Sequence, residues 1–488
     1  MQRNAIVIGA GFGGIGAAIK LKEAGVDVSV LERASRAGGV WRDNDYPGSA
    51  CDVQSYLYSY SFAQKRDWTR RFARQPEILA YIEDVIDQFG IRGHLRYDAE
   101  VVAAAHLDGR WQVRLASGEA LVADILVAAC GQMSTPDTPA LPGLETFGGP
   151  VFHSARWRHD LDLTGLDVSV VGTGSSAIQF VPEIARTARS VTVVQRSTGY
   201  VLDKVDVETD APVPLWRHRF DRYKLFLTKE VLSVRVNHWP ALLRPVERKY
   251  RARLLREVPE PDIRAKLSTR DRFGCKRLLV SDNWFPTVRN PRVNLCIDGV
   301  ARVAPDAVVT TAGQAIPTDV LIFGTGFRST DFLHGIAVHG RGGVSLQERW
   351  AQGAGAYLGM TVPDFPNFFL IYGPNTNVGH NSILFMIESQ LNYLVSALRQ
   401  LDRHDCTTME VRADIAERFD REMQRRSGRT VYAQGCRNWF TTPTGRHTQN
   451  WPGSAIGYWW RTRRVRSRDY EFATTTATFQ RETTRAAH

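Results

Sequence analysis

The stretch AIVIGAGFGG (residues 5–14) joins an apolar, β-branched run to a glycine-rich turn, and this join decides the fold. Glycines in the G-x-G-x-x-G spacing let the backbone turn tightly after a strand and approach a pyrophosphate at a helix start. VSVVGTGSSA (residues 168–177) repeats the pattern about 160 residues later. The spaced glycines are Gly9, Gly11 and Gly14 in the first stretch and Gly172 and Gly174 in the second. One motif is weak evidence, but two predict an α/β chain with two Rossmann-like dinucleotide-binding domains.

The strand after each glycine turn ends in a different type of residue. The strand Val26–Leu31 ends at Glu32, whose carboxylate can accept both hydroxyls of a ribose, so the first domain is predicted to bind FAD. The strand Val191–Val194 leads to Arg196 and Ser197. An always-charged guanidinium beside a hydroxyl suits a 2′-phosphate, so the second domain is predicted to bind NADPH rather than NADH. A surface ion pair is the alternative role for Arg196.

Small-residue turns mark where the chain passes from one predicted domain to the other. The strand Asp124–Ala129 ends at Cys130-Gly131, and the strand Asp319–Phe323 ends at Gly324-Thr325-Gly326. Such turns let the backbone change direction, so we expect both to be crossings between domains. The predicted domains are residues 1–140 for the first part of the FAD-binding domain, 141–325 for the NADPH-binding domain, and 326–488 for the second part of the FAD-binding domain with a C-terminal segment.

Two long stretches have a helical pattern. Leu215–Leu255 is basic and aromatic without strand alternation, which predicts a helical insertion over about residues 205–270 of the NADPH-binding domain. Asn381 to about Leu401 is predicted to be a long apolar helix. Its positive N-terminal end would favour negative charge on a reduced flavin, and a plain core helix is the alternative.

Composition and charge exclude several classes of protein. The chain has 488 residues, of which 43% are hydrophobic and 23% charged, as in ordinary globular proteins. No apolar run reaches about 18 residues and no signal-peptide pattern is present, so we expect a cytoplasmic protein without membrane insertion. The six cysteines are scattered without a CxxC, which predicts reduced thiols, no disulfide framework and no metal site.

The net charge of +11 does not by itself indicate nucleic-acid binding. Five arginines lie between Arg461 and Arg468, but no nucleic-acid motif accompanies them. We therefore expect a solvated charged surface and no nucleic-acid partner, and positive potential would help to collect anionic dinucleotides.

Two further motifs carry more specific information. The first is a loop of small and aromatic residues, Gly38-Gly39-Val40-Trp41, followed by Tyr46-Pro47-Gly48 and Asp52. Its glycines permit close approach to a planar cofactor, and Trp41 offers a surface for packing. The second is Phe147-x-Gly149-x-x-x-His153-x-x-x-Trp157. Together they resemble the two fingerprints of the type I Baeyer-Villiger monooxygenases, and the resemblance extends over nearly the whole chain.

This resemblance implies an activity. In that family NADPH reduces FAD, O₂ adds to the reduced ring, and the resulting C4a-peroxyflavin converts a ketone to an ester or lactone. The expected partners are thus a small-molecule ketone and O₂, whereas the sequence leaves the ketone and the oligomeric state open.

The resemblance also implies roles for individual residues. Arg277 matches the family's active-site arginine, and Asp52 matches its carboxylate partner. A permanent charge at Arg277 would stabilise an anionic oxygen without donating a proton. His153 and Trp157 are expected to be structural, since the fingerprint lies at the entry to the NADPH-binding domain.

The other matched positions are expected to bind the cofactors. Those for FAD are Gly9, Gly11, Phe12, Gly14, Glu32, Gly39, Trp41, Tyr46 and Asp52. Those for NADPH are Gly172, Gly174, Ser175, Ser176, Arg196, Ser197 and Lys276, with Gln132 and Trp439 near the nicotinamide half. Core packing is the alternative for Trp439.

Three other functions share some of these features. A flavin monooxygenase that oxidises nitrogen or sulfur has the same fold and cofactors, but Arg277 and Trp157 favour ketone oxidation. A disulfide reductase needs a redox cysteine pair, and Cys51 has no partner at a suitable spacing. A catalytically silent binding protein would be favoured by the loss of a glycine turn or of an arginine, and none is lost.

Overall fold

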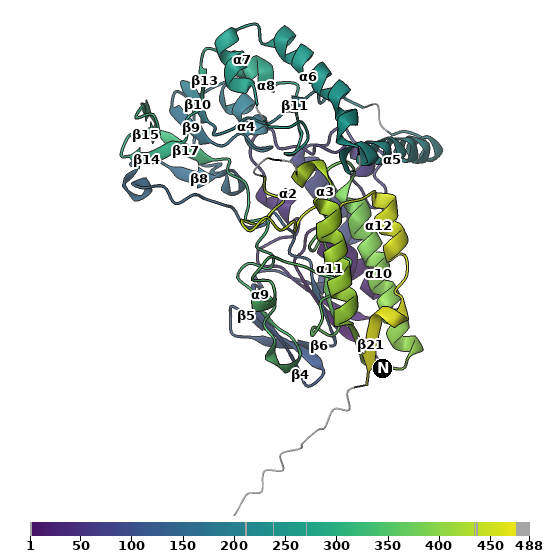
Figure 1. The fold of residues 1–488 in the computed structure, drawn as a ribbon. Coiled ribbons are helices and arrows are strands. Elements are labelled where there is room, and N and C mark those ends of the chain that lie inside the picture. The colour runs from purple at the N-terminus through teal and green to yellow at the C-terminus, as the bar shows by residue number, and fades with distance from the viewer. Residues whose placement is uncertain are drawn as a thin grey trace, which may run out of the picture.

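The computed structural model describes residues 2–209, 212–237, 239–269, 271–433, 435 and 438–474. Two five-stranded parallel sheets organise these residues (Figure 1). The first sheet has the order β19-β7-β1-β2-β3 and the second the order β13-β10-β9-β17-β8. All neighbouring strands within each sheet are parallel. This is the α/β architecture that the paired glycine motifs predict.

The first sheet is built from strands far apart in the sequence. Its strands are β1 (Asn4–Ile8), β2 (Asp27–Leu31), β3 (Leu95–Arg96), β7 (Ile125–Ala128) and β19 (Phe368–Leu370). Every residue of β7 and β19 is buried, as expected for a parallel sheet covered on both faces. Helix α1 (Phe12–Glu23) packs against α10 (Ile383–Arg403), and a Cβ at Gly16 would lie 2.5 Å from Leu391. Glycine at position 16 therefore permits the close approach of these two helices.

The second sheet is likewise built from parallel strands that lie far apart in the sequence. Its strands are β8 (Val151–His153), β9 (Asp167–Val171), β10 (Ser190–Val194), β13 (Val293–Cys296) and β17 (Val320–Phe323). Helices α4 (Ala177–Ile184) and α8 (Trp284–Val288) pack against each other beside it. Figure 1 shows this sheet with α4, α6, α7 and α8 in the upper lobe and β4–β6 with α9–α12 in the lower lobe.

Smaller elements complete the two lobes. The remaining strands are β4 (Val101–Leu107), β5 (Arg110–Leu115), β6 (Ala120–Ala123), β11 (Val201–Leu202), β12 (Leu279–Val280), β14 (Val300–Ala304), β15 (Ala307–Thr310), β16 (Ala315–Pro317), β18 (Ala337–His339), β20 (Thr408–Val411) and β21 (Tyr470–Ala473). The remaining helices are α2 (Val40–Asp43), α3 (Gln75–Gln88), α5 (Leu215–Asn237), α6 (Arg244–Glu257), α7 (Pro261–Leu267), α9 (Leu346–Arg349), α11 (Ala413–Ser427) and α12 (Ala455–Thr462).

Several predicted element boundaries shift in the structure. Helix α1 begins at Phe12, inside the glycine turn, and a Cβ at Gly14 would lie 1.8 Å from the Gly9 carbonyl oxygen. The helical stretch 215–255 contains two helices, since α5 ends at Asn237 and α6 begins at Arg244. Pro240 and Pro245 lie in the first turns of the elements that follow the break, where proline is tolerated.

Two chain segments cross between the lobes and pair with each other. Residues 135–137 and 325–328 form a short antiparallel ribbon with a β-bridge between Pro136 and Phe327. The Asp137 amide donates to the Gly326 carbonyl and the Arg328 amide to the Thr135 carbonyl, each at 3.0 Å. The predicted domain boundaries at residues 140 and 325 lie beside this ribbon and stay predictions. The predicted C-terminal limit at residue 488 lies outside the described residues.

One expectation about the cysteines is wrong. Cys275 is disulfide-bonded, because folding brings together thiols that their spacing along the chain does not reveal. Cys51, Cys130, Cys296 and Cys406 are free, and Cys436 lies outside the described residues. Within the described part of the chain, no helix is long and apolar enough to cross a membrane.

Candidate active site

A first cavity lies at the carboxyl ends of β1 and β2. The predicted residues that line it are Gly9, Gly11, Phe12, Glu32, Gly39 and Gln132. Gly9 has φ +99°, and a Cβ there would lie 2.8 Å from the Ala129 carbonyl oxygen. A Cβ at Gly39 would lie 3.0 Å from the Gly11 Cα. A side chain at either position would collide with neighbouring backbone, so glycine at both lets the segments that form the cavity pack closely together.

Glu32 lies at the end of β2 and is buried. Its carboxylate accepts hydrogen bonds from the amides of Ala10 (2.8 Å) and Ala34 (3.0 Å) and from the Arg42 guanidinium (2.9 Å). Two carboxylate oxygens offer about four acceptor positions, so capacity remains for a ribose hydroxyl. Arg42 also donates to Asp43 at 2.8 Å, which holds the guanidinium at the edge of the cavity.

Gln132 supplies a second polar group to the first cavity. Its Nε2 donates to the carbonyls of Tyr372 and Gly373, both at 3.0 Å. Its Oε1 is buried and has no hydrogen-bond partner among the described residues. An unpartnered buried acceptor is costly, so this position suits a ligand that donates a hydrogen bond.

A second cavity of about 700 Å³ adjoins the first. The two share the wall residues Val40, Tyr58, Met133, Tyr372 and Ile383. The predicted residues that line the second cavity are Trp41, Tyr46, Asp52, Gly172, Gly174, Ser175, Ser176, Arg196, Arg277 and Trp439. The second glycine turn and the predicted catalytic pair thus face one space, which leads towards the first cavity.

Arg277 and Asp52 form an ion pair between the two lobes. Arg277 comes two residues before β12 in the upper lobe, and Asp52 lies in the loop after α2. About one third of the Arg277 side chain and one quarter of the Asp52 side chain are exposed. Both groups therefore keep a face towards the cavity while most of each is shielded from solvent.

The pair is charged on both sides. Burial favours neutral Asp52, but the charge of Arg277 and its hydrogen bond outweigh burial and hold the pKa of Asp52 below its ordinary value. The Asp52 carboxylate in turn raises the pKa of Arg277 above its ordinary value, against the effect of burial. The arrangement presents a permanent cation whose direction is set by a carboxylate.

Hydrogen bonds with neighbouring segments place Asp52. The Cys51 amide donates to the Ala73 carbonyl at 2.9 Å, and the Ser55 amide donates to the Arg71 carbonyl at 2.8 Å. Gln179, on α4 of the upper lobe, accepts from the Ala50 amide (3.2 Å) and donates to the Ala50 carbonyl (3.0 Å). The loop carrying Asp52 is consequently held by both lobes.

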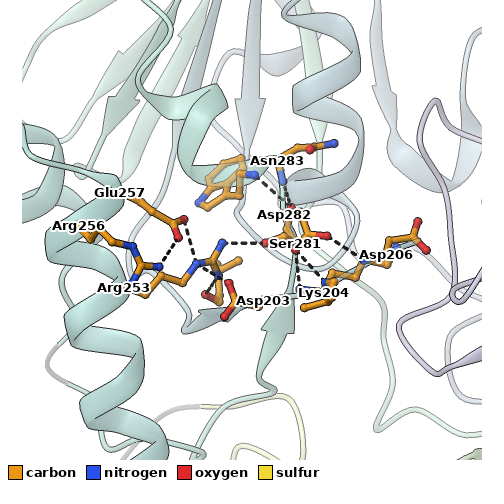
Figure 2. Close-up of polar contacts among 12 residues, drawn as sticks. Asp203, Lys204, Asp206, Arg253, Arg256, Glu257, Ser281, Asp282 and Asn283 are labelled. Carbon is orange, nitrogen blue, oxygen red and sulfur yellow. Dashed lines mark hydrogen bonds and ion pairs between the residues drawn. The ribbon is translucent and has the colours of Figure 1, made fainter. Parts of the chain in front are cut away.

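Asp282 connects the Arg277 segment to this loop through a turn at residues 204–206. Its carboxylate accepts from the amides of Lys204 (2.9 Å), Val205 (2.9 Å) and Asp206 (3.0 Å), and Figure 2 shows these bonds. Val205 has φ +51°, which a β-branched residue rarely adopts. Asp206 then accepts from the Arg70 side chain at 2.9 Å and from the Phe72 amide at 3.2 Å. The turn thereby joins the segment after β12 to the strand-like segment that supports Asp52.

Arg253 braces the other side of this turn. Its side chain is 5% exposed and forms ion pairs with Asp203 (2.7 Å) and Glu257 (3.0 Å). It also donates to the carbonyls of Val201 (3.2 Å) and Ser281 (3.3 Å) (Figure 2). Helix α6 is thus fixed to the segments that enter and leave the Asp282 turn.

A basic group lies beyond the end of β10, as predicted from the strand end. Lys276 Nζ donates to the Ser197 hydroxyl at 2.9 Å and pairs with Asp271 at 2.5 Å. Arg196 lines the second cavity, whereas Ser197 and Lys276 lie outside its wall. Two cations and a hydroxyl at one strand end suit a phosphate monoester.

The aromatic and histidine residues of the two fingerprints divide between cavity and core. Trp41 Nε1 donates to the Tyr58 hydroxyl at 2.9 Å, and the Tyr46 hydroxyl donates to Gln179 at 3.1 Å. His153 is buried, accepts from the Ala155 amide at 3.1 Å, and lines neither cavity. Burial lowers the pKa of His153.

The chain is similar to known proteins over nearly its whole length. Residues 6–237 match the pyridine nucleotide-disulphide oxidoreductase family model. A "Baeyer-Villiger monooxygenase" of Streptomyces coelicolor is 41% identical over 476 residues, which are 95% of this chain and 92% of the relative. The chain belongs to the type I Baeyer-Villiger monooxygenases. A second relative with the same name, from Pseudomonas aeruginosa, is 37% identical over 96% of this chain and 91% of its own length.

Solved structures agree with membership of the Baeyer-Villiger monooxygenases. A closed structure of cyclohexanone monooxygenase superposes with a TM-score of 0.88 at 26% identity, covering 97% of this chain and all of the other. A steroid monooxygenase bound to NADP superposes with a TM-score of 0.87 at 28% identity, covering 97% of this chain and all of the other. OTEMO in complex with FAD and NADP also gives 0.87, at 26% identity, covering 96% of this chain and 99% of the other.

The disulphide chemistry in the family model's description does not suit the cysteines of this Baeyer-Villiger monooxygenase. Cys51 lines the second cavity and Cys130 the first, and both are free thiols. Burial raises the pKa of the Cys51 thiol and raises that of Cys130 to about 12. Neither is therefore the thiolate that disulfide exchange requires. Cys275 is fully buried and lines neither cavity.

Some residues of this Baeyer-Villiger monooxygenase site escaped the sequence analysis. Tyr372, Asn377 and Asn381 line the second cavity, and Tyr372 lies directly before the Gly-Pro-Asn turn that precedes α10. The position of Tyr372, after a buried strand and before a turn, was the feature of the sequence that could have indicated a site residue. Lys204 is also close enough to Asp52 to interact with its charge, although burial lowers the pKa of Lys204. No local pattern distinguishes this lysine from a surface residue.

Proposed function

We propose that this chain uses FAD, NADPH and O₂ to convert a ketone to an ester or lactone, with Arg277 and Asp52 at the reacting centre. The observation that carries this proposal is the ion pair of these residues in the wall of the second cavity, which the second glycine turn lines and which adjoins the cavity of the first glycine turn. The names of the two curated relatives and the FAD and NADP in the solved neighbours support the reaction and the cofactors.

The overall reaction inserts one oxygen atom of O₂ between the carbonyl carbon of the ketone and a neighbouring carbon. The second oxygen atom leaves as water, and NADPH with one proton supplies the two electrons required. When bound, NADPH reduces FAD, and the reduced flavin supplies oxygen in a form that can attack a carbonyl.

Arg277 would act where negative charge develops. Addition of an oxygen nucleophile to a carbonyl places charge on the carbonyl oxygen, and a fixed guanidinium in a shielded cavity stabilises that charge. Because the pKa of Arg277 is raised, the residue would not protonate and so quench the nucleophile. Asp52 would orient Arg277 by holding one edge of the guanidinium.

The remaining residues would bind and separate the cofactors. Glu32 would hydrogen-bond FAD in the first cavity, between the backbone of Gly11 and Gly39. Gln132 was expected near the nicotinamide half of NADPH, but it lines this first cavity, so we assign it to FAD instead. Arg196, Ser197 and Lys276 would bind the 2′-phosphate of NADPH. The indoles of Trp41 and Trp439 would restrict water in the space between the cofactors.

An Arg277→Ala variant tests the catalytic assignment. We expect NADPH to reduce the bound flavin at a rate close to wild type, while ester or lactone formation falls at least about a hundredfold, as for loss of a preorganised charge. Stopped-flow absorbance measures reduction, and gas chromatography of cyclic, linear and steroid-like ketones measures products. Arg158→Ala is the matched control, because Arg158 is half-exposed and pairs with Asp160.

Two outcomes would contradict the proposal. Retained ketone oxygenation in Arg277→Ala would remove this residue from the mechanism. Formation of only hydrogen peroxide or sulfoxides by the wild-type enzyme across the whole ketone panel would instead favour the neighbouring class that oxidises nitrogen and sulfur.

A further inference from the structure

Helix α5 exposes its apolar side chains to solvent. Trp216, Phe220, Tyr223, Leu227 and Val231 are between 37% and 72% exposed. Their spacing of three or four residues places them along one side of the helix, and we call them the α5 stripe. Figure 1 shows α5 at the edge of the molecule, where it extends outward from the body. A surface helix ordinarily buries such a stripe, so α5 is oriented the opposite way.

The inward side of α5 is mainly polar, with Phe226 packed against Phe385 of α10, and its polar contacts fix the rotation of the helix. Arg222 donates to the carbonyls of Tyr56 (2.5 Å) and Ser59 (3.1 Å). Glu230 is buried and accepts from the Asn381 side chain at 2.9 Å and from the Ile456 amide at 3.2 Å. Directional bonds at two positions two turns apart prevent α5 from rolling its apolar side inward. The stripe is therefore exposed because of specific contacts on the opposite side.

Positive charge is concentrated around the stripe. Residues 212–257 contain twelve Lys and Arg against four Asp and Glu, in a chain whose net charge is +11. Arg217, Arg219 and Lys224 are exposed next to the aromatic side chains in the helical sequence. Helices α5 and α6 each contribute six of these cations and two of these acids, so α5 itself has an excess of four positive charges.

Helix α12 adds exposed aromatic and basic residues at the same edge. The bond from Ile456 to Glu230 brings the start of α12 against α5, and Figure 1 shows the two helices close together. Trp459 and Trp460 are exposed, and the Arg463 guanidinium lies 3.5 Å from the centre of the Trp460 ring. Arg463 therefore adds a basic group beside an exposed aromatic ring of α12.

We propose that the α5 stripe docks on an anionic lipid surface, with the helix lying in the plane of the interface. Aromatic side chains bordered by Arg and Lys characterise interfacial helices, because rings enter the headgroup region while cations contact lipid phosphates. A second copy of the chain fits this surface less well, since two strongly positive faces would repel each other. The inference stands independently of the oxygenation reaction.

Vesicle sedimentation with the FAD-loaded enzyme tests the proposal. The wild-type protein should sediment with phosphatidylcholine vesicles that contain about one-third phosphatidylglycerol and stay in solution with phosphatidylcholine alone. Raising the salt to about 0.5 M should weaken binding, because screening removes the long-range attraction. The double variant Trp216→Ser/Phe220→Ser should bind the anionic vesicles roughly tenfold or more weakly.

The matched control is Leu107→Ser/Val122→Ser, which removes exposed apolar side chains from β4 and β6. This control should bind as wild type, and both double variants should retain the wild-type rate of NADPH oxidation, which shows that they fold. The proposal fails if the wild-type enzyme does not bind anionic vesicles or if the α5 variant binds them equally well. It also fails if the variant loses only self-association or binding to soluble polyglutamate, since either result assigns the stripe to a protein partner.

Discussion

Asp52 keeps its negative charge because the Arg277 guanidinium lies against it. The two residues are 225 positions apart in the sequence, since Asp52 follows α2 and Arg277 precedes β12. Most of each side chain is shielded from solvent, so water compensates neither charge fully, and each depends on the other. The pair therefore sets the orientation of the guanidinium that we propose to act in catalysis.

An Asp52→Asn variant should show this dependence as a function of pH. At pH 7 we expect the free energy of unfolding to fall by roughly 1–3 kcal/mol, because Arg277 keeps its charge without a counter-charge. The pKa of Asp52 is lowered in the folded state, so its contribution is complete above the ordinary carboxyl pKa of about 3.9 and is lost as the pH falls through the lower folded value. The difference from wild type should be constant between about pH 5 and 8 and shrink below about pH 4.

Urea unfolding at a series of pH values measures this difference. Asp306→Asn, at an exposed position in the turn between β14 and β15, is the control and should match wild type throughout. A stability difference that already declines between about pH 8 and 6 would show that another group provides the stabilisation.

At the scale of elements, the turn at residues 204–206 connects the segment after β12 to the segment that supports the loop of Asp52. Three amides converge on the Asp282 carboxylate, and Val205 adopts a left-handed conformation within the turn. Such a conformation costs of order 1–3 kcal/mol for a β-branched residue unless its surroundings hold it. Asp282 supplies that support from an otherwise exposed position.

Asp282→Ala should consequently loosen the site without removing any group from it. We expect about 1 kcal/mol lower stability and a roughly threefold to tenfold lower kcat for ketone oxygenation, with flavin reduction nearly unchanged. Asp282→Asn keeps one acceptor oxygen and should recover much of the activity, which a loss of charge alone would not explain. Equal kcat values in Asp282→Ala and wild type would show that the turn does not position Asp52.

Local sequence patterns predicted the elements that bind nucleotides better than those that join them. The glycine turns and the ends of β2 and β10 were predictable because a few adjacent residues determine their geometry. The Asp282 turn was not, since its conformation depends on a carboxylate some 77 residues away from Val205. The inverted orientation of α5 was equally hidden, because a helical pattern does not reveal which side faces the protein.

For the whole molecule, the two-lobed fold and the two cofactor cavities followed from motifs that recur at long spacing. The meeting of Asp52 with Arg277 followed only from family resemblance, because neither residue carries a local signal of its partner. The Cys275 disulfide had no signal in the spacing of the cysteines and contradicted the expected reduced state. Contacts between residues far apart in the chain are thus the part of this structure that local sequence patterns do not predict.

NADP⁺ binding should stabilise the whole molecule in a way that depends on Arg196. At a concentration about a hundredfold above the dissociation constant, a ligand adds about 2.7 kcal/mol to the stability of the folded state. Arg196→Ala should lose roughly tenfold to a hundredfold in NADP⁺ affinity, and with it much of the rise in the thermal midpoint, while the smaller effect of NAD⁺ stays unchanged. Differential scanning calorimetry measures both shifts.

Arg189→Ala is the matched control for this measurement. Arg189 lies in the same lobe and pairs with Asp167 and Asp319 on the surface, so its loss should leave the NADP⁺-dependent shift intact. An undiminished shift in Arg196→Ala would assign recognition of the 2′-phosphate to other residues.

The paired crossing segments at residues 135–137 and 325–328 determine how the lobes can move. Two hydrogen-bonded strands bend readily about an axis that runs across both of them, but they resist torsion and sliding because either would break the bonds between them. The ribbon therefore favours bending over torsion or sliding at this crossing of the chain. We predict that one distance between a probe on each lobe would follow such bending.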